Sequence, residues 1–302
     1  MTEILSLIVG FLIWPGLIVA AALGFFYMWL MRKLTARMQG RKGPPFYQPF
    51  FDFVKLVGKR SLVPRDSSRV LFFLLPFISL TSTVFGLMIL PLPGSAAPSF
   101  SGDLVLLLYL MEMPVLCDVL AGFVSRSIYG QVSAMREAVM SLAYSVPLLA
   151  SVIALAQAAD TFRLAELHTA PFGLVTVIAF IAFAMAIPAR LKSNPFSIPN
   201  AEHEIGHGAH MEYNGLPLAV FELSHALELM LLIGTLYVLF LPGTGHVATD
   251  ALVYLAAGFA VVALVVFAKV STARFTVKSA LRFYWLWGGL AAGAAMVVAI
   301  VS

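Results

Sequence analysis

The chain has 302 residues, of which 61% are hydrophobic and only 11% are charged, and its mean hydropathy is +0.94. A soluble domain carries about 25% charged residues, so this composition excludes a cytosolic globular enzyme, a disordered chain and a nucleic-acid-binding protein, and it predicts a polytopic membrane protein. The single cysteine, Cys117, excludes a disulfide framework and any thiolate-held zinc or iron–sulfur site within this chain.

Apolar runs of about 20 residues predict the transmembrane helices, because that length crosses the hydrocarbon core. Eight such runs cover residues 4–30, 70–91, 103–124, 133–157, 171–189, 218–241, 248–268 and 282–301. The first run has no cleavage-site pattern, so we expect an uncleaved span. The predicted fold is all-α, a single membrane domain over residues 1–302 with two long loops at about 31–69 and 190–217.

The basic residues predict the orientation of these helices, because loops rich in lysine and arginine stay in the cytoplasm. Residues 31–69 hold ten of the 19 lysines and arginines, and seven more fall in or beside the connections on the same predicted side. We therefore expect the long loops to be cytoplasmic and both termini to lie outside.

The first long loop contains a short amphipathic pattern. Phe50, Phe53, Val54 and Val57 fall on one stripe of a helix, and Lys55 and Lys59 lie outside it. This predicts a cytoplasmic amphipathic helix in the membrane interface. Two interpretations remain open: an anchor on acidic lipid, and a docking surface for a peripheral protein.

The second long loop crowds three glutamates and three histidines into eleven residues, 202–212. It contains His203-Glu204-Ile-Gly-His207, which matches the zinc-protease pattern of two histidines one helical turn apart. Gly206 and Gly208 weaken the required helix, and the only acid after Glu228 is Asp250, on the predicted outer side. An intramembrane zinc metalloprotease is therefore a remote alternative, and a solvated polar loop is another.

Ionisable residues inside the predicted spans each need a reason, since a charge at the bilayer centre costs about 2.5–3.5 kcal/mol on insertion scales. Arg136 and Glu137 are adjacent and could neutralise each other. Glu222, His225 and Glu228 share one side of a helix, where we expect them to pair with one another around water. Such groups suit a proton route; the others inside the spans are Glu112, Asp118 and Tyr144.

Three motifs give the chain its resemblance to a known family. The first is Ala36-Arg37-Met-Gln-Gly-Arg41-Lys-Gly43-Pro44, followed by Gln48-Pro49 and Asp52-x-x-Lys55-Leu56. The second is Ser133-Ala-Met-Arg136-Glu137 leading to Tyr144, and the third runs from Asn194-Pro-Phe196 through Ala201-Glu202-x-Glu204 to Glu212-Tyr213-x-Gly215. Together they resemble the H subunit of respiratory complex I and its relatives in membrane-bound energy-converting hydrogenases and formate hydrogenlyases.

The resemblance implies a connector in a prokaryotic inner membrane, with no complete active site, no metal and no cofactor in this chain. Iron–sulfur clusters and a nickel–iron centre are expected in hydrogenase-like small and large partner subunits, beside antiporter-like membrane subunits. Contact with this peripheral arm is expected at Arg37, Arg41, Lys42, Asp52 and Lys55. The expected proton path comprises Glu112, Asp118, Arg136, Glu137, Tyr144, Glu202, Glu204, Glu212, Glu222, His225 and Glu228.

The chain departs from the family pattern at two places. Pro45-Phe46-Tyr47 bridges directly to Gln48, a shorter form than the complex I sequences carry, and this favours the hydrogenase branch. Tyr144 is followed by Ser145 instead of a glutamate, so one carboxylate of the usual path is missing. We therefore expect a connector that couples a hydrogenase-like arm to proton or sodium translocation. The alternatives are the quinone-site subunit of a complex I-type oxidoreductase and a free-standing ion transporter.

Overall fold

The computed structural model describes residues 10–95, 97–206 and 208–301, and throughout this part of the chain the regular structure is helical. The helices, with two short irregular turns, are α2 (Leu17–Met38), α3 (Gln48–Val57), α4 (Arg69–Ile89), α5 (Asp103–Val124), α6 (Ile128–Ala159), α7 (Leu164–Thr169), α8 (Leu174–Arg190), α9 (Glu202–Ile205), η1 (Gly208–His210), α10 (Gly215–Phe240), α11 (Val247–Ser271), α12 (Val277–Phe283), η2 (Tyr284–Gly288) and α13 (Gly289–Val301).

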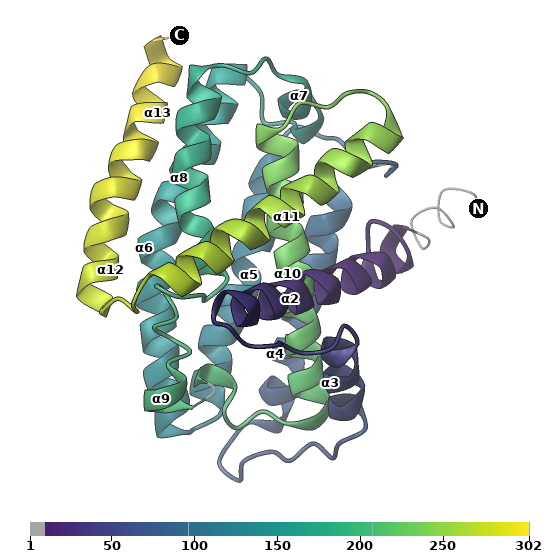
Figure 1. The fold of residues 1–302 in the computed structure, drawn as a ribbon, viewed down its shortest axis with the longest axis vertical. Helices are drawn as coiled ribbons and strands as arrows, with labels where there is room; N and C mark the ends of the chain where they lie inside the picture. The colour runs from purple at the N-terminus through teal and green to yellow at the C-terminus, as the bar shows by residue number, and fades with distance from the viewer. Residues whose placement is uncertain (1–9, 96, 207, 302) are drawn as a thin grey trace.

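Most of the long helices stand upright beside one another, and two cross them at a steep tilt. Figure 1 shows α2 and α11 running across the front of the upright α10. The end that carries α3 and α9 is the lower one in this view, and α7 and the C-terminus lie at the other end. We call these the α3/α9 end and the α7 end.

Helix α10 forms the centre of the molecule. Every residue from Ala226 to Phe240 is buried, and neighbouring helices pack around it from α2, α4 and α11. A helix that is apolar all round is stable only when other helices or lipid cover it on every side. Glu228, within this buried stretch, is therefore held inside protein, away from lipid.

Glycines permit the tilted helices to approach so closely. A Cβ on Gly24 of α2 would lie 2.5 Å from the carbonyl oxygen of Ala226 in α10, and a Cβ on Gly258 of α11 would lie 2.4 Å from the Tyr27 ring. Tyr27 also donates a hydrogen bond of 3.0 Å to the carbonyl of Leu255. Small residues at such crossings let helix backbones pack directly in a membrane.

The structure confirms the all-α, multi-pass architecture. In the described residues, seven helices are long and apolar enough to cross a membrane: Gly10–Met38, Arg69–Ile89, Asp103–Val124, Ile128–Ala159, Gly215–Phe240, Val247–Ser271 and Val277–Val301. The span predicted over residues 171–189 corresponds to α8, which has only 17 residues. At 1.5 Å per residue α8 covers about 25 Å, so it is short for a membrane crossing.

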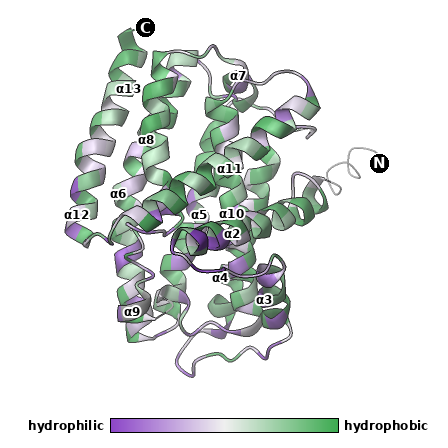
Figure 2. Cartoon of the chain, viewed as in Figure 1, coloured by the Kyte–Doolittle hydropathy of each residue, from purple (hydrophilic) through white to green (hydrophobic). Residues whose placement is uncertain are grey.

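The polar surface gathers at the α3/α9 end. Figure 2 shows hydrophilic residues at α3, at α9 and at the end of α2, whereas hydrophobic residues dominate the helices above. The predicted amphipathic helix is present as α3, and the Phe53 ring packs against Phe25 of α2 with 5.7 Å between ring centroids. Phe50, Val54 and Val57 face outward and remain exposed. The predicted stripe is thus divided between the two faces of α3.

Candidate functional site

A group of charged side chains is buried where α5, α6 and α10 meet the chain just after α8. Asp118 and Glu137 are almost fully buried, and the ammonium group of Lys192 forms an ion pair with Asp118 Oδ2. The same ammonium nitrogen lies 3.8 Å from Glu137 Oε1. We call Lys192, Asp118, Glu137, His210 and His225 the lysine cluster.

The chain turns sharply at the end of α8 to bring Lys192 into this cluster. The amide of Lys192 donates to the carbonyl of Ala189 and the amide of Ser193 donates to Pro188, both at 2.9 Å, which is the Schellman arrangement. Lys192 has a φ of +48°, a left-handed conformation that favours glycine. The chain therefore carries a lysine where a glycine would be easier, and the side chain supplies the buried cation.

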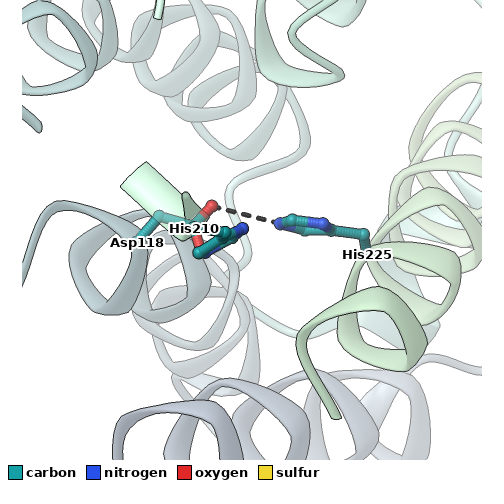
Figure 3. A group of neighbouring side chains, drawn as sticks. All are labelled: Asp118, His210 and His225. Carbon is teal, nitrogen blue, oxygen red and sulfur yellow. Dashed lines mark hydrogen bonds and ion pairs between the residues drawn. The ribbon is translucent and has the colours of Figure 1, made fainter. Parts of the chain in front are cut away.

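Two histidines converge on the Asp118 carboxylate. His210 Nε2 lies 3.1 Å from Oδ1, and His225 Nε2 lies 3.1 Å from Oδ2. Figure 3 shows both imidazole rings turned toward this carboxylate, with His225 reaching it from the facing helix. Burial lowers the pKa of His210, and the nearby Asp118 carboxylate only partly offsets this. His210 therefore favours its neutral form at neutral pH.

A second group of buried charges surrounds Arg190, the last residue of α8. Its guanidinium pairs with Glu112 at 2.7 Å and with Glu228 at 3.5 Å, and its side chain is completely buried. Ser145 donates a 3.1 Å hydrogen bond to the other oxygen of Glu112. We call Arg190, Glu112, Glu228 and Ser145 the arginine cluster.

The backbone of α5 also contacts this guanidinium, close to a proline in the helix. Pro114 has no amide proton for the carbonyl of Leu110, so it interrupts the regular hydrogen bonding of α5. The carbonyl of Met111, in the same turn, accepts a hydrogen bond from Arg190 Nη2. Thus Arg190 is held both by carboxylates and by the helix backbone.

A surface ion pair and two cavities connect the lysine cluster with the α3/α9 end. Glu204 is held by Arg136 at 2.8 Å and by Arg274, and the hydrogen bond from Arg136 lowers the pKa of Glu204. Arg274 borders a 300 Å³ cavity with Glu204 and a 490 Å³ cavity with Lys192. All residues that line the larger cavity are polar or charged. Arg274 thus lines both cavities, and Lys192 brings the buried cluster to the wall of the larger one.

Several predicted proton-path residues come together here, but their partners differ from those expected. Arg136 pairs with Glu204 and not with its neighbour Glu137, which lies buried beside Lys192. The expected mutual pairing of the α10 residues is wrong: His225 pairs with Asp118 and Glu228 with Arg190. Side chains at these positions point to different neighbouring helices, which supply closer partners.

Glu222 lies apart from both clusters. It lines a crevice of 120 Å³ between α2, α3 and α10, together with Asp52 and Arg32. Asp52 accepts hydrogen bonds from Gln48 at 2.9 Å and from Arg32 at 3.4 Å. The Asp52 carboxylate therefore pairs within this part of the chain. Its expected contact with a peripheral arm remains a prediction.

Several buried side-chain atoms in and near the clusters lack hydrogen-bond partners among the described residues, including Arg190 Nε and Glu228 Oε1. Neither oxygen of Glu137 receives a hydrogen bond, and the Tyr144 hydroxyl has no partner either. Buried polar atoms are rarely left without partners, so each such atom requires an explanation. Glu137, a member of the lysine cluster, and Tyr144 lie about two turns apart on α6.

The remaining predicted residues lie at the α3/α9 end. Arg37, Arg41, Lys42 and Lys55 are exposed, and Arg41 donates to Gln39 within the loop after α2. Their predicted contact with a peripheral arm remains a prediction.

The acidic loop contributes less to the buried site than its composition suggested. Glu212 is partly exposed and has no ion pair with any described residue. The side chains of Glu202, His203 and His207 lie outside what the structure describes. Glu204 is held by two arginines, so its carboxylate is engaged in ion pairs.

Sequence analysis missed four members of the clusters: Ser145, Arg190, Lys192 and His210. The two basic residues were assigned only to a cytoplasmic loop. A charge balance could have found the two cations, because Glu112, Asp118, Glu137, Glu222 and Glu228 bring five acids into the predicted spans, where Arg136 is the only cation away from the span ends. Such an excess of acids predicts cations that enter from a loop end.

Comparison with known proteins places this geometry in a family. Residues 11–300 match the family described as NADH dehydrogenase. The chain is 32% identical over 238 residues to an H subunit of the NADH-quinone oxidoreductase of Syntrophobacter fumaroxidans, covering 72% of each chain. It is 31% identical over 260 residues to the H subunit of the same oxidoreductase in Anaplasma marginale, covering 78% of this chain and 74% of that one.

A solved structure shares nearly the whole fold. It is a chain from the membrane-bound sulfane sulfur reductase, an archaeal respiratory membrane complex, with a TM-score of 0.88 and 28% sequence identity. The match covers 99% of this chain and all of that chain.

Proposed function

Because this chain belongs to the NADH dehydrogenase family, as an H-type membrane subunit of a complex I-like oxidoreductase, we propose that it couples a peripheral redox arm to ion translocation in an energy-converting, hydrogenase-like complex. In this role it is a connector without a complete active site. The peripheral arm docks at the α3/α9 end. Changes in charge that its redox chemistry causes are transmitted through the two buried clusters to the membrane-spanning helices.

One observation carries this proposal: two ion clusters are buried among the helices, and one of them reaches a polar cavity through Lys192. Charged groups inside a membrane protein are costly and mark ion or proton pathways by default. Lys192 lines the cavity and contacts Asp118 and Glu137, and Arg190 holds Glu112 and Glu228 one step further into the helices. Protons taken up through the cavity reach these carboxylates by way of Lys192.

The α3/α9 end supports the docking part of the proposal. It carries the exposed cations Arg37, Arg41 and Lys55 beside the outward-facing side chains Phe50 and Val54 of α3. Positive charge next to an apolar face suits a partner protein at the membrane surface. In this arrangement the end is cytoplasmic, both termini lie outside, and the iron–sulfur clusters and nickel–iron centre belong to hydrogenase-like partner subunits.

The nature of the electron acceptor separates this proposal from its alternative. The sulfane sulfur reductase shows that a near-complete copy of this fold occurs in a respiratory complex named for an acceptor other than quinone, which supports the hydrogenase-like assignment. The purified complex should evolve hydrogen from a reduced low-potential donor. Reduction of a quinone analogue without hydrogen evolution would replace this assignment by the alternative.

The alternative is a quinone-site subunit of a complex I-type oxidoreductase. It is favoured by the names of the curated relatives and by the 120 Å³ crevice between α2, α3 and α10, which mixes Phe25, Met28 and Phe53 with Glu222. Substituting Phe53 by Trp would narrow the crevice. This change should abolish quinone reduction under the alternative and leave hydrogen evolution intact under our proposal.

A further inference from the structure

The convergence of two histidines on one carboxylate has a chemical use beyond charge coupling. We infer that Asp118, His210 and His225 form a binding site for a divalent transition-metal ion such as Zn²⁺. Their ligand atoms, one from each residue, all lie within 4.8 Å of one another. Imidazole nitrogen and carboxylate oxygen are ligands that zinc prefers, and three protein ligands leave one position open.

The geometry needs only a small adjustment, because the two nitrogens and the carboxylate oxygen already lie within 4.8 Å of one another. Zinc bonds of about 2.1 Å at tetrahedral angles set the ligand atoms roughly 3.4 Å apart. Both Nε2 atoms already lie 3.1 Å from oxygens of the same carboxylate, and Figure 3 shows the rings turned inward from separate elements. His210 comes from η1 and is fixed by stacking on Phe221, with 4.2 Å between ring centroids. Three elements therefore hold the ligands in place.

Lys192 competes directly with a metal at this site, because its ammonium group is paired with Asp118 Oδ2. The structure supplies a second place for that ammonium. Glu137 Oε1 is 3.8 Å away, and neither Glu137 oxygen receives a hydrogen bond from the described residues. When the metal binds Asp118, Lys192 moves to Glu137 and keeps a partner. This explains why the Glu137 carboxylate receives no hydrogen bond: it is the second partner to which the lysine moves.

The test uses the full-length chain, purified in detergent with an affinity tag that contains no histidine. Co²⁺ is the probe, because its visible absorption in a nitrogen–oxygen site reports binding, and Zn²⁺ is then added to displace it. We expect one ion per chain. His210→Asn and His225→Asn should each weaken binding by about tenfold or more. His246→Asn, at the exposed start of α11, is the matched control and should bind as the unchanged chain does.

The competition between Lys192 and the metal ion for Asp118 gives a second measurement, in which a substitution strengthens metal binding. Lys192→Met should tighten Co²⁺ binding by about tenfold, because a positive charge next to the ion is removed. Glu137→Gln should weaken it, since the displaced lysine loses its other carboxylate. Equal binding by the unchanged chain and by both histidine variants would overturn the site. So would the absence of bound Co²⁺ in a folded unchanged chain. None of these measurements depends on turnover, so they are independent of the proposed function.

Discussion

The surroundings of Glu137 are those of a carboxylate that exchanges protons, and they differ from those of a carboxylate that only stabilises the fold. It is 2% exposed, it lies 3.8 Å from Lys192, and it receives no hydrogen bond from the described residues. A carboxylate that only stabilises a fold is normally satisfied by hydrogen bonds. Glu137 can therefore gain and lose a proton without breaking a hydrogen bond to the described residues.

Glu137→Gln should therefore leave the complex assembled but lower ion translocation by about tenfold or more, because the amide cannot exchange the proton. The measurement is ion uptake by proteoliposomes at a matched rate of electron transfer. Glu166→Gln, an exposed change in α7, is the control. Translocation at the full rate in the Glu137 variant would remove this residue from the path.

Arg190 has the opposite character, because its guanidinium is held by two carboxylates and a backbone carbonyl. Replacing it by Met strands Glu112 and Glu228, and breaking a buried ion pair costs about 3–5 kcal/mol. The thermal unfolding midpoint of the purified chain should fall accordingly. Arg163→Met, which removes an exposed pair 3.5 Å from Glu166, should cost less than about 1 kcal/mol.

A rescue experiment checks the cause of the Arg190 effect. Adding Glu112→Gln and Glu228→Gln to Arg190→Met removes the stranded charges and should restore part of the lost stability. If the combined variant is less stable than Arg190→Met alone, the loss comes from packing and not from charge.

Glu204 predicts a pH dependence at the surface. The hydrogen bond from Arg136, aided by Arg274, lowers its pKa below the ordinary 4.5. The folded form therefore binds this proton less readily than the unfolded form, so the stabilisation is present above about pH 4.5 and is lost as the pH falls through the lowered pKa. Protease sensitivity of the 191–214 loop should rise over that window.

Glu204→Gln should show the raised protease sensitivity already at pH 7 and should depress turnover while the complex stays assembled. A loop that is equally resistant in both proteins at pH 7 would show that the arginine pairs do not hold it.

At the scale of elements, α2 and α3 together form the candidate docking surface. Arg37 is in the last turn of α2, Arg41 follows in the loop, and α3 lies beside them. Neither arginine pairs with an acid among the described residues, so both charges are available to a partner.

Replacing Arg37 and Arg41 by Ala should release the peripheral subunits, which co-purification measures directly. The loss should be greater at higher salt, because exposed charge pairs are screened. Arg163→Ala, which removes a cation near the α7 end, is the control. Normal co-purification of the double variant would disprove the docking surface.

At the scale of the whole molecule, orientation follows from which end is polar and basic. Cys117 is buried and is the only cysteine, so single cysteines can be introduced without a competing thiol. Leu62→Cys lies at the α3/α9 end and Phe172→Cys in the connection after α7, and both side chains are exposed.

A membrane-impermeant maleimide should label Leu62→Cys only after the membrane is opened and Phe172→Cys in intact cells. The reverse pattern would invert the proposed topology.

The sequence by itself determined the helices, the all-α class and the family. These properties are local: the apolar length of a span, the stripe on α3 and the motifs around Arg37, Arg136 and Glu202 are readable without knowing any neighbour. The number of spans was less secure, since α8 is shorter than the 171–189 run that predicted it.

Only the tertiary structure decided which charges meet. Arg190 reaches Glu112 across 78 positions and Lys192 reaches Asp118 across 74, after a left-handed turn at a lysine. No sequence spacing encodes such pairs, because the cost of a buried charge depends on the helices that surround it. For that reason Glu222, His225 and Glu228 share one helix and still have separate partners.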